Sequence, residues 1–80
     1  MVNTTTDKTT KEFGLRIKNR RREMALSQEE LGEVAGLHRT YIGHLERGEV
    51  NPSLINILRV AKALKIDPSD LVSGLKIPKR

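Results

Sequence analysis

The apolar residues in the middle of the chain are spaced as in two short amphipathic helices that cross at a tight turn. The residues that would form the shared seam are Leu31, Ala35, Leu37, Ile42 and Leu45. Gly36 follows the first apolar segment, where a left-handed helix cap favours a residue without a side chain. Gly32 is small where the second helix must come close. The pattern predicts helices over 28–35 and from the residue after His38 to about Arg47.

The second of these helices would carry a set of outward-facing residues. Its members are Arg39, Thr40, Gly43 and His44. Two short helices joined by a glycine turn, with polar and basic residues on the outer face of the second, are typical of a helix-turn-helix that reads DNA.

Sequence signals also predict one helix before this pair and two after it. The first covers about 11–24 and has apolar residues at spacings of four and seven, namely Phe13, Ile17 and Met24. The fourth begins after the cap residue Ser53, and the fifth runs from Asp67-Pro68 to a stop at Gly74. The fourth carries a broad apolar stripe that we expect to cover the core. Its members are Leu54, Ile57, Leu58, Ala61 and Leu64.

The domain organisation follows from these elements. Residues 1–10 are polar and rich in threonine, which predicts a flexible arm. Residues 11–74 would form the DNA-binding domain, and 75–80 a basic tail. Because every element is helical and every connection short, we expect an all-α, compact five-helix domain.

Composition narrows the function classes. The chain has 80 residues, with 15 Lys and Arg against 10 Asp and Glu, and its net charge of +5 suits a polyanionic partner. It has no cysteine, and its two histidines, His38 and His44, lack nearby ligand partners, so no metal or cofactor is expected. No small-molecule ligand is expected either.

Several other classes are disfavoured. The sequence shows no paired catalytic carboxylates in a cleft-forming context and no glycine-rich phosphate loop, so an enzyme is not expected. A single Phe and a single Tyr offer little surface for stacking the bases of single-stranded nucleic acid. No apolar run approaches the length of a membrane span, and the start lacks the apolar core of a signal peptide, so we expect a cytoplasmic protein with no membrane partner.

Residues 13–71 resemble the helix-turn-helix domain of lambdoid phage repressors and the wider Xre family. The matching positions are Gln28, Leu31, Gly32, Ala35, Gly36, Leu37, Ile42, Leu45, Glu46 and Gly48. More narrowly, 36–42 together with 53–57 is similar to the controller proteins of restriction-modification systems. The resemblance implies a lambda-repressor-like fold. The chain departs from the family pattern at Arg20, where many relatives are apolar, and at Ala25, where relatives often have glycine.

The third helix supplies the predicted base-reading residues. Its first turn would meet base edges in the major groove, where Arg39 can pair with guanine O6 and N7 and Thr40 can give a hydroxyl or methyl contact. His44 lies four residues after Thr40 on the same face and is a further candidate. The alternatives are that Arg39 contacts only phosphate or solvent, and that His44 is an ordinary surface residue.

Four residues are candidates for contacts with the DNA backbone. Gln28 starts the second helix, whose free amides favour phosphate, and the resemblance implies the same role. Tyr41 would reach a phosphate or sugar, as in controller proteins, or else pack within the domain. Arg47 and Asn51 flank the loop after the third helix, where basic groups and amides commonly hold phosphate.

The resemblance also assigns structural and dimer roles. It implies an ion pair between Arg21 and Glu46 that fixes the third helix and does not itself read DNA. Controller proteins are commonly apolar at the position of Ile55, so this residue, joined by Ile66 and Val72, would form a dimer interface. The alternative is that Ile55 packs into the monomer core.

These observations favour one function over two rivals. We expect a homodimeric regulator of transcription that binds duplex DNA at a near-palindromic operator, and we favour the controller of a restriction-modification operon. The rivals are an autoregulatory antitoxin, which usually needs extra chain to wrap a toxin, and a phage-type repressor, which usually adds a further domain.

Overall fold

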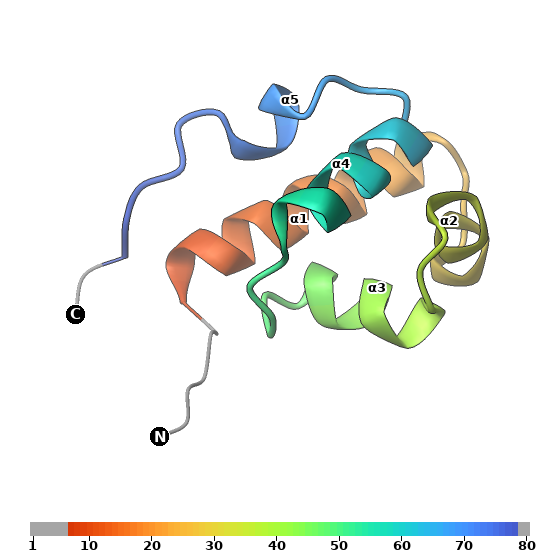
Figure 1. Ribbon diagram of the computed structural model, residues 1–80, viewed down its shortest axis with the longest axis horizontal. Helices are drawn as coiled ribbons and strands as arrows, with labels where there is room; N and C mark the ends of the chain where they lie inside the picture. Colours follow the sequence, from red (N-terminus) through yellow and green to blue (C-terminus); the bar gives the residue numbers. More distant parts are fainter. Residues whose placement is uncertain (1–6, 79–80) are drawn as a thin grey trace.

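The computed structural model describes residues 7–78, and within that range the chain forms five helices and no strand. The helices are α1 (Lys8–Glu23), α2 (Gln28–Ala35), α3 (Arg39–Glu46), α4 (Leu54–Ala63) and α5 (Ser69–Val72). The long α1 runs through the middle of the molecule, and α3 and α5 pack against it, while α2 contacts both α3 and α4 (Figure 1). The expected all-α, lambda-repressor-like arrangement is confirmed.

The first helix begins earlier than the sequence signals predicted. Asp7 caps α1, because its carboxylate accepts a hydrogen bond from the backbone N–H of Thr10 at 2.8 Å. In return, the backbone N–H of Asp7 donates to the hydroxyl oxygen of Thr10. The prediction of a flexible arm over 1–10 is therefore wrong for Lys8 to Thr10. Residues 1–6 and 79–80, which complete the predicted arm and basic tail, lie outside the described residues.

The predicted seam between the second and third helices is confirmed. Four of its members are buried, and Leu37 is partly buried against them. They join residues of α1, α4 and α5 in one core, which consists of Phe13, Ile17, Leu31, Ala35, Ile42, Leu45, Val60, Ala61, Ala63, Leu64 and Leu71. One continuous core therefore holds the helix pair on the rest of the domain.

The predicted core stripe of the fourth helix is partly wrong. Leu54 and Leu58 are 68% and 42% exposed, whereas Val60, which was not in the stripe, is fully buried. The buried positions of α4 all lie in its C-terminal half, where the helix packs against α2. Leu54 and Ile55, in the first turn of α4, therefore remain on the surface.

Two loops close with a left-handed residue that is not glycine. Ala25 has φ 58° in the turn after α1, and Lys65 has φ 56° after α4. The turn at Ala25 thus adopts the backbone conformation that glycine would allow, at a cost of about 1–2 kcal/mol. Arg20 lies at the same end of the molecule and donates from Nε to the Leu64 carbonyl at 3.0 Å. This bond satisfies a free carbonyl at the end of α4.

Two backbones approach closely at glycine. Gly36 has φ 74° and ends α2 as predicted, and a Cβ on Gly32 would overlap the Leu37 carbonyl oxygen. A Cβ on Gly14 of α1 would overlap the Leu45 carbonyl oxygen of α3. The turn and the crossing of α1 with α3 therefore both require a residue without a side chain.

None of the helices within residues 7–78 is long and apolar enough to cross a membrane.

The replacement Gly14→Ala is expected to lower the free energy of unfolding by about 1–3 kcal/mol, because two backbones must separate to admit the methyl group. Gly43→Ala is the matched control in α3, since its methyl would meet only the flexible guanidinium of Arg47, at 3.1 Å. The control is expected to be neutral or to stabilise by up to about 1 kcal/mol through helix propensity. Urea denaturation measures both, and equal losses would contradict the close approach.

Candidate DNA interface

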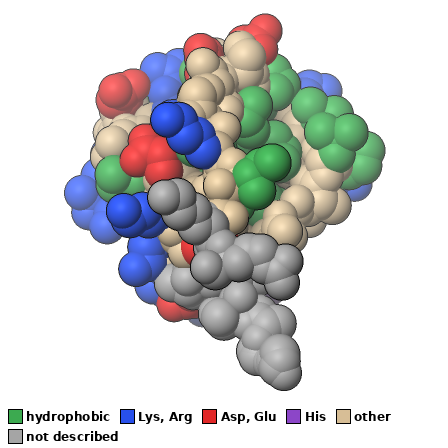
Figure 2. All heavy atoms as spheres, turned by 90° about the vertical axis from the view of Figure 1, so that its left-hand side faces the viewer, with side chains coloured by type: hydrophobic (Ala, Val, Ile, Leu, Met, Phe, Trp, Pro, Cys, Tyr) green, Lys and Arg blue, Asp and Glu red, His purple; other side chains and the backbone are tan. Residues whose placement is uncertain are grey.

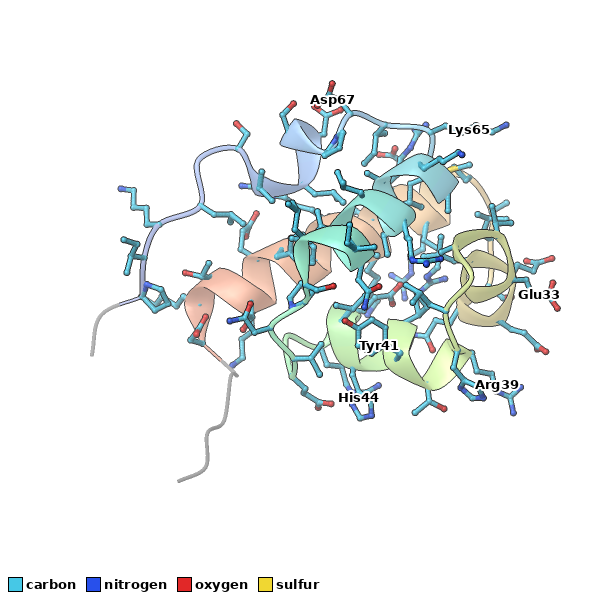
Figure 3. The ribbon with its side chains drawn as sticks, viewed as in Figure 1. Glu33, Arg39, Tyr41, His44, Lys65 and Asp67 are labelled. Atoms are coloured by element: carbon cyan, nitrogen blue, oxygen red, sulfur yellow. The ribbon has the colours of Figure 1, made fainter. Side chains whose placement is uncertain are left out.

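The outer face of α3 projects away from the body of the domain. Arg39 and His44 extend from the same edge of the helix into solvent, as Figure 3 shows. Thr40 is also exposed, between them along the chain. Gly43, which was predicted to face outward, is instead buried beneath the guanidinium of Arg47. The exposed face of α3 therefore presents Arg39, Thr40 and His44.

A buried ion pair fixes the other side of α3. Arg21 of α1 donates to both oxygens of Glu46, from Nε at 2.6 Å and from Nη2 at 3.0 Å, and the Glu46 side chain is only 2% exposed. Arg21 also donates from Nη1 to the Leu26 carbonyl at 2.8 Å. The hydrogen bond with Glu46 is the largest influence on Arg21 and raises its pKa. The ion pair implied by the resemblance is present, with the two-bond geometry that makes such pairs directional.

Gln28 completes this buried cluster. Its side-chain nitrogen donates to Glu46 Oε1 at 3.0 Å, so helices α1, α2 and α3 meet at one carboxylate. The amide nitrogen carries two hydrogens, and Glu46 takes one of them. Ser27 and Glu30 form the predicted capping box just before, with hydrogen bonds of 2.9 and 2.8 Å.

The start of α3 is capped by a histidine, which sequence reasoning did not single out. Nδ1 of His38 accepts a hydrogen bond from the backbone N–H of Thr40 at 3.0 Å. Arg39 follows directly and lies near Glu29 of α2, with Nη1 to Oε1 at 3.4 Å and both side chains more than 60% exposed. An exposed pair at that distance restrains the arginine only weakly, so its guanidinium remains available to a ligand.

Three linked side chains lie at the other end of α3. Glu49 accepts a hydrogen bond from Arg47 Nε at 3.1 Å, and its second oxygen contacts His44 Nδ1 at 2.8 Å. The hydrogen bonds from Arg47 and then His44 lower the pKa of the Glu49 carboxyl. Glu49 was missed by the sequence analysis. Its position two residues after Arg47 and five after His44 was the available signal.

Two further residues were predicted to contact the DNA backbone: Tyr41, which lies within α3, and Asn51, which follows it. Tyr41 is partly buried against the core, and its hydroxyl accepts a hydrogen bond from the Asn56 amide at 3.1 Å. The phenol therefore packs within the domain, the alternative that the sequence left open, with its oxygen at the partly buried edge. Asn51 is exposed in the loop before α4.

An exposed apolar surface covers the start of α4. Leu54, Ile55 and Leu58 are 68%, 58% and 42% exposed, and Val72 of α5 is 41% exposed. Hydrophobic side chains gather at the upper right of the face seen in Figure 2. Ile66, which was expected to join this surface, packs instead against the core, because the left-handed turn at Lys65 folds the chain back onto α4.

Within residues 7–78, no group of three His, Cys, Asp or Glu side chains is placed to hold an ion.

The buried cluster predicts that two Glu→Gln substitutions lower the free energy of unfolding by very different amounts. Glu46→Gln leaves Arg21 buried without a counter-charge, and we expect it to lower the free energy of unfolding by about 3–5 kcal/mol. Glu12→Gln is the control, because Glu12 forms an exposed ion pair with Arg16 at 3.1 Å, and its loss is expected to cost less than about 0.5 kcal/mol. Thermal or urea unfolding compares them. A Glu46→Gln variant as stable as the control would show that the cluster does not hold α3.

Comparison with known proteins identifies relatives with the same fold. The control protein C.SmaI of Serratia marcescens is 51% identical over 53 residues, a match that covers 64% of this chain and 63%, just under two thirds, of the Serratia protein. The crystal structure of the restriction-modification controller protein C.AhdI from Aeromonas hydrophila superposes with a TM-score of 0.76 and 47% identity, and the match covers 78% of this chain and 94% of that one.

A phage protein has the same fold. The P22 c2 repressor, crystallised in complex with a synthetic operator, matches with a TM-score of 0.73 and 35% identity over 78% of this chain and 94% of its own. Residues 17–71 match the helix-turn-helix family. This stretch includes α2, α3 and α4, and it contains all three residues of the buried cluster, Arg21, Gln28 and Glu46. The chain therefore belongs to the helix-turn-helix family of DNA-binding transcriptional regulators.

Proposed function

We propose that the protein binds duplex DNA sequence-specifically as a homodimer and controls a restriction-modification operon. One observation carries the proposal: the side chains of α3 that project outward belong to a helix whose opposite face is locked by Arg21, Gln28 and Glu46. A rigid helix with an exposed polar face can enter the major groove without losing further conformational freedom.

Arg39, Thr40 and His44 would read bases. Arg39 stands in the first turn of α3, the part of a recognition helix that meets base edges, and its fork of donors matches guanine O6 and N7. Thr40 offers a hydroxyl for a hydrogen bond or a methyl for a thymine contact. His44 lies one turn further along the same face, so it would reach a neighbouring base pair.

The backbone contacts would come from both sides of α3. The second hydrogen of the Gln28 amide and the free N–H groups at the start of α2 suit one phosphate. Arg47 and Asn51, which lie on exposed surface after α3, suit another. The net charge of +5 supplies attraction that does not depend on sequence.

The apolar surface made by Leu54, Ile55, Leu58 and Val72 supports the homodimer. Full burial of one such apolar side chain stabilises the buried state by about 1.5–3 kcal/mol. Four such residues at one end of a small domain form an unusual exposed patch. A twofold axis through this surface would present two α3 helices about 34 Å apart, one turn of DNA, and would require a near-palindromic site.

The controller role rests on the relatives. Two controller proteins match this chain at 47–51% identity. The alternative is a phage-type repressor, because the P22 c2 repressor matches at 35% identity; an antitoxin is the third possibility. The neighbouring genes separate these roles: a methyltransferase or endonuclease gene supports the controller, an immunity region the phage repressor, and a toxin gene the antitoxin.

Arg39→Ala is expected to reduce the preference for the selected site over random duplex by about 5- to 150-fold, the value of one bidentate base contact. Binding that remains should be weak and sensitive to salt. Arg39→Lys is the matched control, because it keeps the charge and loses the fork. If the preference falls in Arg39→Ala, Arg39 reads a base. If the preference is unchanged while the affinity for all duplexes falls, Arg39 contacts only phosphate. Selection from a duplex library followed by titration measures these ratios.

Ile55→Asp is expected to convert the dimer to monomers, because a carboxylate would be buried in an apolar contact. Sedimentation at micromolar concentration measures the oligomeric state. Val34→Asp is the control, since Val34 is 65% exposed on α2, beside Arg59 and Lys62, and should leave the dimer intact. An Ile55→Asp variant that sediments as a dimer would refute this interface.

A further inference from the structure

The contact between Glu49 and His44 determines where the imidazole proton lies. Glu49 Oε1 is 2.8 Å from His44 Nδ1, and the other carboxylate oxygen accepts from Arg47 Nε at 3.1 Å. An ionised carboxylate can only accept hydrogen bonds, and the pKa of Glu49 is lowered by these two partners. Nδ1 of His44 must therefore carry the hydrogen in this contact.

A competing contact is weaker. Arg47 Nη2 lies 3.4 Å from the same His44 nitrogen. Arginine only donates, so this contact would require an unprotonated Nδ1 and is incompatible with the bond to Glu49. The contact with Glu49, at 2.8 Å, is 0.6 Å shorter than the contact with Arg47, at 3.4 Å, and it is assisted by charge. The Nδ1–H form of the ring is thus favoured.

We infer that Glu49 is a specificity-determining residue that fixes the tautomer of His44 and so decides which base groups that side chain can recognise. With the hydrogen on Nδ1, the neutral ring presents Nε2 as an acceptor on the exposed face of α3. An acceptor in the major groove pairs with the exocyclic amino group of adenine or cytosine and not with guanine O6 or thymine O4. The assignment of bases rests on the proposed function, whereas the tautomer does not.

Glu49 also changes how Arg47 meets DNA. In the free protein the charge of the Arg47 guanidinium is compensated by the Glu49 carboxylate. A DNA phosphate must therefore displace Glu49 before it can bind Arg47. This exchange weakens binding to any duplex, regardless of sequence. The two effects of Glu49 are distinct: the histidine contact selects the base, whereas the arginine contact lowers the affinity for every duplex to the same extent.

The chain supplies an internal reference for the tautomer. Its two histidines are His38 and His44. Nδ1 of His38 accepts a hydrogen bond from the Thr40 backbone, so that ring must carry its hydrogen on Nε2. The two rings are therefore predicted to hold opposite tautomers in the same molecule, and one nitrogen NMR spectrum of the side chains can display both.

The first experiment uses the free protein at about pH 8, where histidine rings are mostly neutral. Side-chain nitrogen NMR is expected to show the Nδ1–H form for His44 and the Nε2–H form for His38, with a His38→Asn variant to assign the signals. In Glu49→Gln the His44 preference should weaken, because an amide can pair with either form. In Glu12→Gln, which removes an equal charge on the α5 side of α1, it should not. An Nε2–H ring at His44 in the unsubstituted protein overturns the inference.

The second experiment selects binding sites from a duplex library with the same proteins. Glu49→Gln is expected to lose about 2- to 10-fold of the preference for adenine or cytosine at one base pair in each half-site, the effect of one hydrogen bond, while the other positions keep theirs. Its affinity for random duplex should rise and depend more steeply on salt. An unchanged preference at every position overturns the role in specificity. If the unsubstituted protein selects no sequence, the proposed function fails, and the NMR result still decides the tautomer.

Discussion

The fold depends on a single carboxylate. Glu46 is buried where three helices meet, and it accepts two hydrogen bonds from Arg21 and one from Gln28. A charge buried at this depth is tolerable only when its partners are in place, so the orientation of α3 relative to α1 and α2 is set by a constraint that apolar packing alone would not impose. Leucine and isoleucine contacts can slide, whereas a pair of parallel hydrogen bonds to a guanidinium cannot.

Glycine provides the second constraint, and the two act together. The Arg21 side chain can reach Glu46 because α1 and α3 approach closely at Gly14, where a methyl group would meet the Leu45 carbonyl. Leu45 and Glu46 are neighbours on α3, so the tight backbone contact and the ion pair lie within one turn of each other. A small domain without disulfides gains its rigidity here from geometry and charge, since its core is limited in size.

The sequence predicted the parts of the structure that local signals determine. The Ser27 capping box, the left-handed Gly36 and the buried seam all depend on residues close in the chain, and the structure contains each of them. The failures have a different cause. Whether Leu54 faces the core depends on how far α2 extends along α4, and the pairing of Glu49 with His44 depends on the path of the loop after α3. The helical periodicity of the sequence gives no information on the extent of α2 along α4 or on the path of that loop.

The polar face of α3 is already paired before any ligand arrives. Arg39 lies near Glu29, and Arg47 and His44 share Glu49, so each of these three side chains has an acidic neighbour on this same chain. Binding DNA then exchanges a carboxylate for a phosphate or a base edge, and the net gain per contact is smaller than for a free arginine. A regulator must find one site among a great excess of others, so specificity depends on the ratio of the two affinities. An acidic partner that weakens binding to every sequence equally leaves this ratio unchanged and lowers only the occupancy of DNA in general. The ratio itself changes where a carboxylate shapes a base contact, as we infer for Glu49 at His44.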